Sequence, residues 1–365
     1  MSMQKIGFIG LGLIGGSIAK TIKKKAPSTT LIATARHKET IIEAYESRII
    51  SNSDLLPLTA FADCDCIFLC TPVQQNLTYL EQLKTIIQPS CIITDVGSVK
   101  TDIHKAVIHL DMEKNFIGGH PMCGSEKTGF SNATDHLLEN AYYILTPAFQ
   151  ISNSKIQKFL NLIKSLGAIP MILDYETHDY ATAAISHLPH IIAASLVNLI
   201  SDLDDKHETM RTIAAGGFKD ITRIASSSPI MWQNICLSNQ EQILRVIDSY
   251  LSSLQKIRLD IQNKASGKIS TFFEEAKDYR DSMTSTTSGL YAESHIVYCD
   301  LIDEAGAIAT LATIMASHNI SIKNIGILHN REFEDGVLQI EFYEKESLQS
   351  ALKLLSDNHY LVHKR

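Results

Sequence analysis

A glycine-rich turn close to the N-terminus constrains the fold of this 365-residue chain more than any other feature. The turn, Gly10–Gly15, has the spacing Gly-x-Gly-x-x-Gly, follows the apolar run Lys5–Ile9 and opens the helix-like segment Gly16–Lys24. A strand, a glycine turn and a helix in this order begin a dinucleotide-binding βαβ unit. The turn therefore predicts an N-terminal Rossmann-type domain.

Each glycine of the turn has its own physical role. Gly10 permits the tight turn, Gly12 lets the backbone approach a pyrophosphate, and Gly15 allows the helix to pack closely on the strand. Backbone N–H groups at the helix start then face the anion. The residues predicted to bind the cofactor are Gly10, Gly12, Leu13, Ile14 and Gly15, with Thr71 and Pro72 directly after the strand Ile67–Cys70.

The end of the second strand leaves the choice between NAD and NADP open. An NAD site places Asp or Glu there, roughly 20 residues beyond the turn, to bind the ribose 2′-hydroxyl. The run Leu31–Lys38 has no acidic residue, and Glu39 is too far along to replace one. Arg36 and Lys38 are either ligands of a 2′-phosphate or solvated charges at the strand end. We expect NAD(P), with Arg36 as a candidate contact.

Composition narrows the class of protein. Hydrophobic residues make up 45%, charged residues 20%, and the mean hydropathy is +0.02, which is typical of a globular protein. The net charge of −7 is spread along the chain, which argues against a nucleic-acid surface. No uninterrupted apolar run approaches the roughly 20 residues of a spanning helix, and no signal-peptide pattern precedes the first strand. We expect a cytoplasmic protein with a small-molecule partner and neither a membrane nor a nucleic-acid partner.

The cysteines indicate a reduced core and no metal site. There are seven, an odd number, and Cys64, Cys66 and Cys70 lie on an apolar strand-like run. No C-x-x-C pair or H-E-x-x-H motif supplies metal ligands.

Alternation of apolar runs with helix-period segments predicts a doubly wound α/β domain over residues 1–173. The expected strands are Ile6–Ile9, Leu31–Thr34, Ile67–Cys70, Ile92–Thr94, Phe116–Ile117, Tyr143–Leu145 and Ile169–Leu173. Residues 174–282 show helical spacing only and predict an all-helical domain. The polar stretch Asp281–Gly289 is typical of a linker. Residues 290–365 follow with the order βαββαβ, a ferredoxin-like arrangement.

Four segments carry a family resemblance: Asp95–Lys100, Gly119–Glu126, Ser186–His190 and Gly216–Ala225. In order and register they resemble the prephenate/arogenate dehydrogenase family. The resemblance implies that the helical domain forms a homodimer and that prephenate is oxidatively decarboxylated with NAD(P)⁺ in tyrosine biosynthesis, with NAD⁺ as the usual cofactor.

The resemblance also assigns site residues. It implies His120 as the base, Ser98 as hydroxyl partner of the reacting group, and Arg223 as the ligand of a substrate carboxylate. Other residues that it places in the pocket are Glu126, Ser186 and His190. Ser125 is a further candidate, and Lys219 either pairs with Asp220 in a structural role or forms part of the pocket wall.

Chemistry supports these assignments independently. Histidine, with an ordinary pKa near 6.5, is suited to accept an alcohol proton near neutral pH. Arg223 can bind a carboxylate through two parallel hydrogen bonds. Ser98 is either a substrate contact or the N-cap of a helix that begins near Val99, and both can hold. His190, at the expected start of a helix, could cap it, touch the cofactor or, as we expect, contact substrate.

The C-terminal order resembles an ACT domain, the small module that binds amino acids in many biosynthetic enzymes. Many such domains have proline before the glycine of the first loop, where this chain has Ala305. Tyrosine is the natural effector, because an end product sensed at a second site can shift an enzyme between states; an inert dimerisation module is the alternative. The expected effector contacts are Asp303, Ala305, Gly306, Asn319 and Ile320.

Three competing functions remain. An arogenate dehydrogenase differs only in the amine that replaces the side-chain ketone. A β-hydroxyacid dehydrogenase would need a catalytic lysine on the first interdomain helix, where this chain has Ser186–His190. A non-catalytic sensor of nucleotide and amino acid has no need of His120, Ser98 and Arg223 together.

Overall fold

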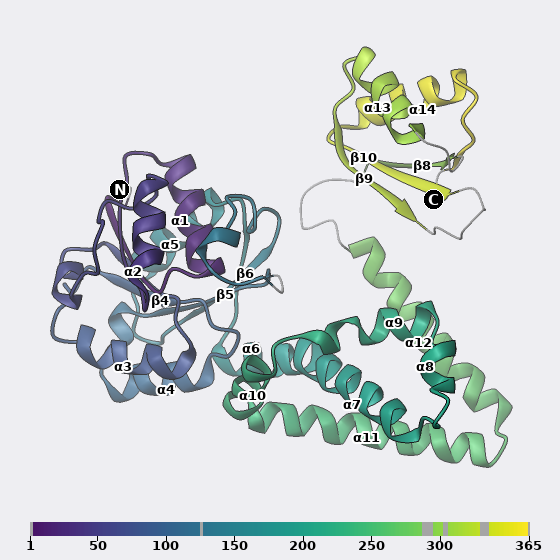
Figure 1. The fold of residues 1–365 in the computed structure, drawn as a ribbon, viewed down its shortest axis with the longest axis horizontal. Helices are drawn as coiled ribbons and strands as arrows, with labels where there is room; N and C mark the ends of the chain where they lie inside the picture. The colour runs from purple at the N-terminus through teal and green to yellow at the C-terminus, as the bar shows by residue number, and fades with distance from the viewer. Residues whose placement is uncertain (1–2, 125–126, 287–294, 302–305, 329–335, 364–365) are drawn as a thin grey trace. The chain divides into compact units, whose positions relative to one another are not determined.

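The computed structural model describes residues 3–124, 127–286, 295–301, 306–328 and 336–363. The chain divides into two compact units, Met1–Gln255 and Lys256–Arg365 (Figure 1).

A parallel sheet forms the base of the first unit. Four strands lie in the order β2-β1-β3-β4, and an isolated parallel bridge between Ile93 and Phe116 connects β4 to a second group in the order β5-β6-β7. β5 runs antiparallel to β6, and β6 runs parallel to β7. The bounds are β1 (Lys5–Ile9), β2 (Thr30–Thr34), β3 (Cys66–Leu69), β4 (Ile92–Asp95), β5 (Ile117–Pro121), β6 (Tyr142–Pro147) and β7 (Ile169–Ile172). The doubly wound fold and its seven expected strands are confirmed.

Helices cover both faces of this sheet (Figure 1). One face packs against α1 (Leu13–Lys25), α2 (Lys38–Glu46) and α5 (Asn153–Ser165), the other against α3 (Val73–Leu83) and α4 (Thr101–His109). Short 3₁₀ turns lie at η1 (Leu58–Phe61), η2 (Glu113–Asn115) and η3 (Phe130–Asn132). Phe68 is fully buried in the core. The centroid of its ring lies 5.2 Å from that of Phe8, on which it stacks, and 6.0 Å from that of Phe159.

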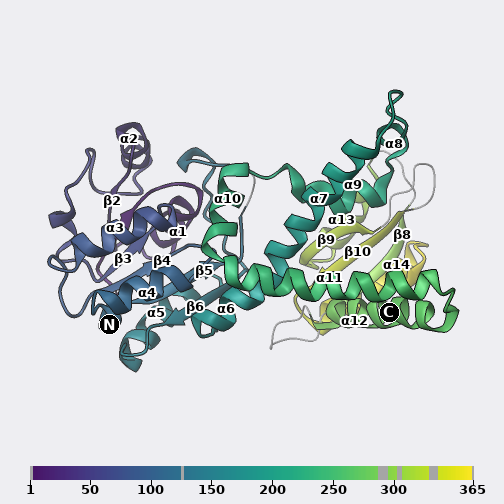
Figure 2. The ribbon, with the colours of Figure 1, turned by 90° about the horizontal axis from the view of Figure 1, so that it is seen from below.

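The rest of the first unit is helical, as expected (Figure 2). It consists of α6 (Tyr175–Thr182), the π-helical turn η4 (Ala183–His187), α7 (Leu188–Leu203), α8 (Thr209–Ile213), α9 (Gly216–Thr222), η5 (Arg223–Ser226), α10 (Pro229–Ser238) and α11 (Gln240–Gln262). A small apolar cluster of Ala183, Ile243 and Val246 packs the start of the long α6–α7 helix against α11.

The helix α7, which carries His190, begins at Leu188, as expected. It is not a free helix start, because the helical backbone already runs from Tyr175 through α6 and η4 into α7. Proline is tolerated at position 189 because the wide π turn before it already interrupts the regular hydrogen-bond ladder. Such turns are frequent at functional sites, and this one lies beside Ser186 and His187.

Large apolar side chains stay exposed on the helical segment. They include Ile185, Leu203, Ile213, Ile230, Leu237 and Leu244. Within the described part of the chain, Tyr175–Leu203 is the one helix that is long and apolar enough to cross a membrane, by length and composition only, and 17% of its most apolar window is buried. An exposed apolar surface of this kind is also typical of a protein–protein interface.

The second unit contains the helix α12 (Ser266–Thr286) and an antiparallel sheet in the order β11-β8-β10-β9. The sheet and its two helices follow the expected order βαββαβ: β8 (His295–Leu301), α13 (Ala307–Ser317), β9 (Ile322–Leu328), β10 (Gly336–Phe342), α14 (Lys345–Asp357) and β11 (Val362–His363). One face carries a core that includes Val297, Leu311, Met315 and Leu355.

The expected linker starts too early. α12 continues to Thr286, past Asp281, whose carboxylate lies 3.2 Å from the ammonium of Lys277 one turn earlier. An ion pair at this spacing stabilises a helix by about 0.2–0.5 kcal/mol.

The aromatic core suggests a stability test. Phe68→Ala should lower the free energy of unfolding by about 3–5 kcal/mol, because it removes a fully buried ring and leaves a cavity. Phe149→Ala is the matched control, since Phe149 is 98% exposed, and it should change stability by less than about 0.5 kcal/mol. Chemical denaturation of both variants measures the difference, and equal losses would contradict the assignment of the core.

Candidate active site

The glycine turn has the geometry of an anion cradle. Gly10 has φ +91° and donates its N–H to the carbonyl of Thr34 at 2.8 Å. A Cβ at Gly10 would lie 2.7 Å from the carbonyl oxygen of Cys70, and one at Gly15 would lie 2.8 Å from the carbonyl oxygen of Gly10. The turn therefore presses against the end of β3 with no room for side chains at these two positions.

Gly12 faces the other way, toward open space. A Cβ there would meet no atom within 4 Å. Gly12 is also the N-cap of α1, with no side chain bonded to the helix start and no acidic residue in its first turn, which includes Leu13 and Ile14. The N–H groups of this helix start are thus available to a phosphate, and the chain fits a dinucleotide at this point.

The other predicted cofactor residues surround the turn. Thr71 has its methyl group beside Gly10 and donates its hydroxyl to Oδ1 of Asn76 at 2.6 Å, and Pro72 is the exposed N-cap of α3. The amide nitrogen of Asn76 is buried and has no hydrogen-bond partner within the part of the chain that the structure describes. At the end of β2, Arg36 is exposed, while Lys38 pairs with Asp54 at 3.0 Å.

One buried carboxylate connects the loop that carries Ser98 to β5, the strand that carries His120. Oδ2 of Asp95 accepts the N–H of Gly97 at 2.9 Å, and its Oδ1 accepts the N–H of Gly119 at 3.2 Å. Ser98 follows Gly97, and His120 follows Gly119, so both lie at the carboxyl edge of the parallel strands β4 and β5. Both are half-buried.

A buried cation completes this arrangement. Lys100, which is fully buried, forms an ion pair with Asp95 and donates to the carbonyl of Gly119 at 2.9 Å. Burial lowers the pKa of Lys100 below its ordinary value, and the adjacent Asp95 carboxylate opposes that shift. The pair is held by hydrogen bonds on both sides, as a buried charge requires.

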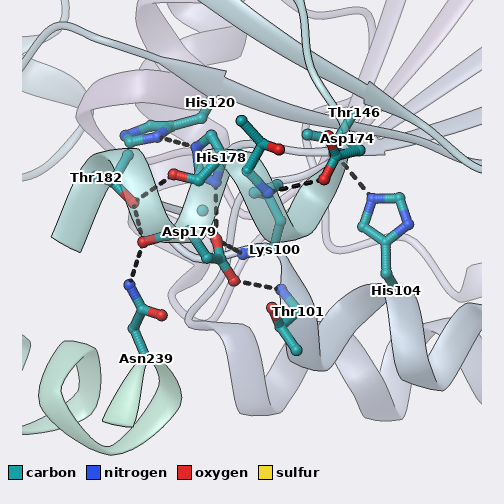
Figure 3. Close-up of polar contacts among 12 residues, drawn as sticks. Lys100, Thr101, His104, His120, Thr146, Asp174, His178, Asp179, Thr182 and Asn239 are labelled. Carbon is teal, nitrogen blue, oxygen red and sulfur yellow. Dashed lines mark hydrogen bonds and ion pairs between the residues drawn. The ribbon is translucent and has the colours of Figure 1, made fainter. Parts of the chain in front are cut away.

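His120 is the first member of a hydrogen-bonded chain of buried groups. Its Nδ1 lies 2.8 Å from Nε2 of His178, and Nδ1 of His178 lies 2.7 Å from Oδ1 of Asp179 (Figure 3). The Asp179 carboxylate also accepts the backbone N–H of Lys100 at 2.8 Å and of Thr101 at 2.7 Å. His178 and Asp179 are on α6, so this chain of contacts joins the helical part to the sheet.

The environment keeps His120 neutral. Burial, then the neighbouring His178 and Lys100, hold the pKa of His120 well below its ordinary value. Burial alone would raise the pKa of Asp179, but the hydrogen bonds from His178, Thr101 and Lys100 outweigh it and lower that pKa. A neutral imidazole beside an ionised carboxylate is what a proton acceptor needs.

The remaining predicted pocket residues surround His120 less closely. Ser186 is half-buried in η4, and His190 stacks on Trp232 with ring centroids 4.0 Å apart and hydrogen-bonds the backbone of Ile224. Arg223 and Lys219 are exposed on η5 and α9, both of which pack on α7. Among the described residues, no hydrogen bond, ion pair or ring contact joins Arg223 to His120, and Ser125 and Glu126 lie outside those residues.

Two sequence expectations need comment. Ser98 is not the N-cap of α4, so this alternative is wrong: the cap residue is Lys100, and Asp179 binds the N–H groups there.

In the second unit, Gly306 has φ +94° before α13, Asn319 is exposed with φ +56°, and Ile320 is buried. Asp303 and Ala305 lie outside the described residues.

Sequence reasoning missed three polar residues at this site. They are His178, Asp179 and Asn239, and all are buried. Asn239 donates to the carbonyl of Asp179 at 2.8 Å and lies 3.1 Å from Nδ1 of His187. The available signal was the adjacent pair His178–Asp179 on a helix that is otherwise mostly apolar toward its C-terminal end.

Hydride transfer to a nicotinamide needs a dinucleotide cradle and a nearby base for the alcohol proton. Both lie here at the carboxyl edge of one sheet, so the fold and the site define a nicotinamide-dependent dehydrogenase.

Comparisons with known proteins give the family. Models described as prephenate dehydrogenase, nucleotide-binding domain, and prephenate dehydrogenase, dimerization domain, match residues 18–171 and 174–275. The chain is 38% identical to prephenate dehydrogenase of Bacillus subtilis over 347 residues, which cover 94% of this chain and 93% of that protein. It therefore belongs to the prephenate dehydrogenase family.

Solved structures support the same family assignment. Prephenate dehydrogenase from Aquifex aeolicus, in complex with hydroxyphenyl propionate and NAD⁺, matches with a TM-score of 0.72 at 29% identity and covers 78% of this chain and 99% of its own. Synechocystis arogenate dehydrogenase matches with a TM-score of 0.70 at 30% identity and covers 76% and 99%. The family's dimerization domain accounts for the exposed apolar side chains of α7 to α11 as a homodimer interface.

The buried histidines predict acid sensitivity. Burial lowers the pKa of His104 and of His187 from 6.5 to about 4. The unfolded chain therefore binds protons that the folded chain does not, and the free energy of unfolding should fall as the pH drops from 6.5 toward 4, by up to about 3 kcal/mol for each histidine.

Urea denaturation across this pH range measures the effect. His104→Gln should remove the share of the acid-induced loss that His104 contributes, up to about 3 kcal/mol, whereas His136→Gln, at an exposed side chain, should leave the loss unchanged. An unaltered pH dependence in His104→Gln would contradict the assignment.

Proposed function

We propose that the chain oxidatively decarboxylates prephenate to 4-hydroxyphenylpyruvate, with His120 as the general base. The observation that carries the proposal is the 2.8 Å contact of Nδ1 of His120 with Nε2 of His178, which leaves the other ring nitrogen of His120 without a hydrogen-bond partner among the described residues. Burial lowers the pKa of His120, which favours the neutral ring. The Aquifex aeolicus relative is bound to hydroxyphenyl propionate, which has the phenol and the acid-bearing side chain of the proposed product.

The reaction balances without an outside acid or base. His120 takes the proton from the C4 hydroxyl as the C4 hydride leaves, and C4 becomes a carbonyl. The bond from C1 to its carboxylate then breaks, CO₂ departs, and its electron pair restores the aromatic ring and leaves a phenolate. That oxygen recovers the proton from His120. The nicotinamide, when bound, supplies the hydride acceptor.

Ser98 and Arg223 have complementary tasks in this proposal. Asp95 binds both the Ser98 loop and the strand of His120. Ser98 hydrogen-bonds the C4 oxygen. Arg223 binds a substrate carboxylate through two hydrogen bonds. It is exposed on η5, which packs on the helix of His190, so its guanidinium is accessible to a ligand. We assign Ser125, Glu126, Ser186, His190 and Lys219 to the surrounding pocket.

Arogenate is the alternative substrate, because the chain is 30% identical to an arogenate dehydrogenase over three quarters of its length. The two substrates differ in one side-chain group, remote from C4. Assays of prephenate and arogenate, each with NAD⁺ and NADP⁺, separate the possibilities. A non-catalytic sensor would turn over neither.

The remaining assignments concern regulation and cellular context. We propose three functional parts: residues 1–173 bind nucleotide, the helical part from residue 174 dimerises, and residues 290–365 bind tyrosine near Asp303, Ala305, Gly306, Asn319 and Ile320. The βαββαβ sheet supports an ACT-like module. Indifference of the enzyme to tyrosine would favour the inert dimerisation module. We further propose a cytoplasmic enzyme without membrane or nucleic-acid partners.

The role of His120 is tested by substitution. His120→Asn should leave the Kd for nucleotide largely intact and lower kcat by about two to four orders of magnitude, because a general base is lost. Steady-state kinetics and nucleotide titration measure the two effects. Near-normal turnover would reject the proposed base.

Cofactor preference is tested at Arg36. If its guanidinium binds a 2′-phosphate, Arg36→Ala should weaken NADP⁺ binding by about tenfold, or about 1.4 kcal/mol, and NAD⁺ binding much less. Arg48→Ala, at another exposed arginine of this domain, is the control. An equal effect on both nucleotides would make Arg36 a solvent-exposed charge.

A further inference from the structure

We propose that His178 and Asp179 are positioning residues that hold His120 in the single tautomer able to act as a base. The inference rests on the proposed role of His120 and adds two residues to that site. Neither residue is expected to touch substrate; both act through the imidazole of His120.

The tautomers follow from the hydrogen bonds. Both oxygens of Asp179 accept backbone N–H groups, from Lys100 at 2.8 Å and Thr101 at 2.7 Å, as expected for an ionised carboxylate. Nδ1 of His178, 2.7 Å from Oδ1, must therefore donate to it. In the neutral ring, Nε2 is then an acceptor.

The same logic continues to His120. Because Nε2 of His178 accepts, Nδ1 of His120 must donate across the 2.8 Å contact. The Nε2 of His120 is left with its lone pair and no proton, which is the state that can remove a proton from an alcohol. In the opposite tautomer Nε2 would carry a hydrogen and could not accept one.

Burial makes this arrangement rigid. His178 and Asp179 are 0% exposed, so water cannot replace either contact. Thr182 donates its hydroxyl to the carbonyl of His178 at 3.0 Å, and Asn239 donates to the carbonyl of Asp179 at 2.8 Å. The pair is therefore fixed from its own helix and from the junction of α10 and α11.

The carboxylate of Asp179 also binds the segment that follows Ser98. By binding the N–H groups of Lys100 and Thr101, Asp179 fixes the chain two residues after Ser98. One side chain of the helical part thus sets the tautomer of His120 and the position of the Ser98 loop. When His120 briefly holds the substrate proton, its ring is positively charged. Nε2 of His178, which accepts a hydrogen bond from that ring, and the Asp179 carboxylate bonded to His178 then stabilise the charge.

The experiment compares three variants of the full chain. His178→Phe keeps the ring volume and removes the acceptor, whereas in His178→Gln the amide oxygen can still accept from Nδ1 of His120. His104→Phe is the matched control: His104 is another buried histidine of this half, bonded to Thr146 Oγ1 at 2.8 Å and outside the proposed chain.

The expected pattern is specific to a tautomer effect. His178→Phe should lower kcat by about 100-fold with little change in KM or nucleotide Kd, His178→Gln should stay within about tenfold of the original enzyme, and His104→Phe should stay within about threefold even if it is less stable. Nitrogen-15 spectra of histidine-labelled protein should show Nε2 of His120 unprotonated in the original and Gln proteins and partly protonated in the Phe variant. The His120→Asn protein identifies the resonance.

Several outcomes overturn the proposal. Near-normal turnover in folded His178→Phe would do so, and so would equal losses in all three variants. If the Phe variant does not fold, a protonated Nε2 of His120 in the original protein or in His178→Gln overturns it as well. If His120→Asn is inactive and His178→Phe is active, only the positioning role of His178 is rejected. If His120→Asn is active, the proposed function is rejected as well.

Discussion

A fully buried ion pair between Asp95 and Lys100 holds the catalytic edge of the sheet together. Removing two charges from water is costly, and the cost is offset here because both partners are hydrogen-bonded further, to the N–H groups of Gly97 and Gly119 and to the carbonyl of Gly119. Breaking one partner would leave the other charge buried and unpaired. The ion pair therefore holds the Ser98 loop and the strand of His120 together before any substrate binds.

The helical part contributes to the same edge through α6. His178 and Asp179 meet His120 on one side and the start of α4 on the other, so the base, the serine loop and the helix form one hydrogen-bonded unit. The nucleotide turn at Gly10–Gly15 is built separately, by close contact of the backbone with the end of β3. Binding of nucleotide and activation of the base thus depend on different contacts within one sheet.

Much of the fold could be predicted because its signals are local. The strand Ile67–Cys70 is a short apolar run, and the turn at Gly10–Gly15 lies between a strand and a helix, so each could be recognised within a few residues. The motif around His120 was likewise contiguous. By contrast, the partner of His120 is His178, 58 positions further on, and only the folded chain brings the two rings to 2.8 Å.

Errors arose where a local pattern competed with a tertiary contact. Ser98 looks like a helix cap, yet the carboxylate of Asp179, on a distant helix, takes that task. Pro189 suggests a helix start, and α7 does begin at Leu188, but the π turn η4 joins it directly to α6. The polar residues after Asp281 suggest a linker, although α12 continues to Thr286.

The long helix Tyr175–Leu203 has polar, buried groups at its beginning and exposed apolar side chains such as Leu199 and Leu203 toward its end. The same helix therefore carries the positioning pair of His120 at its start and an apolar surface at its end, with the π turn η4 between them.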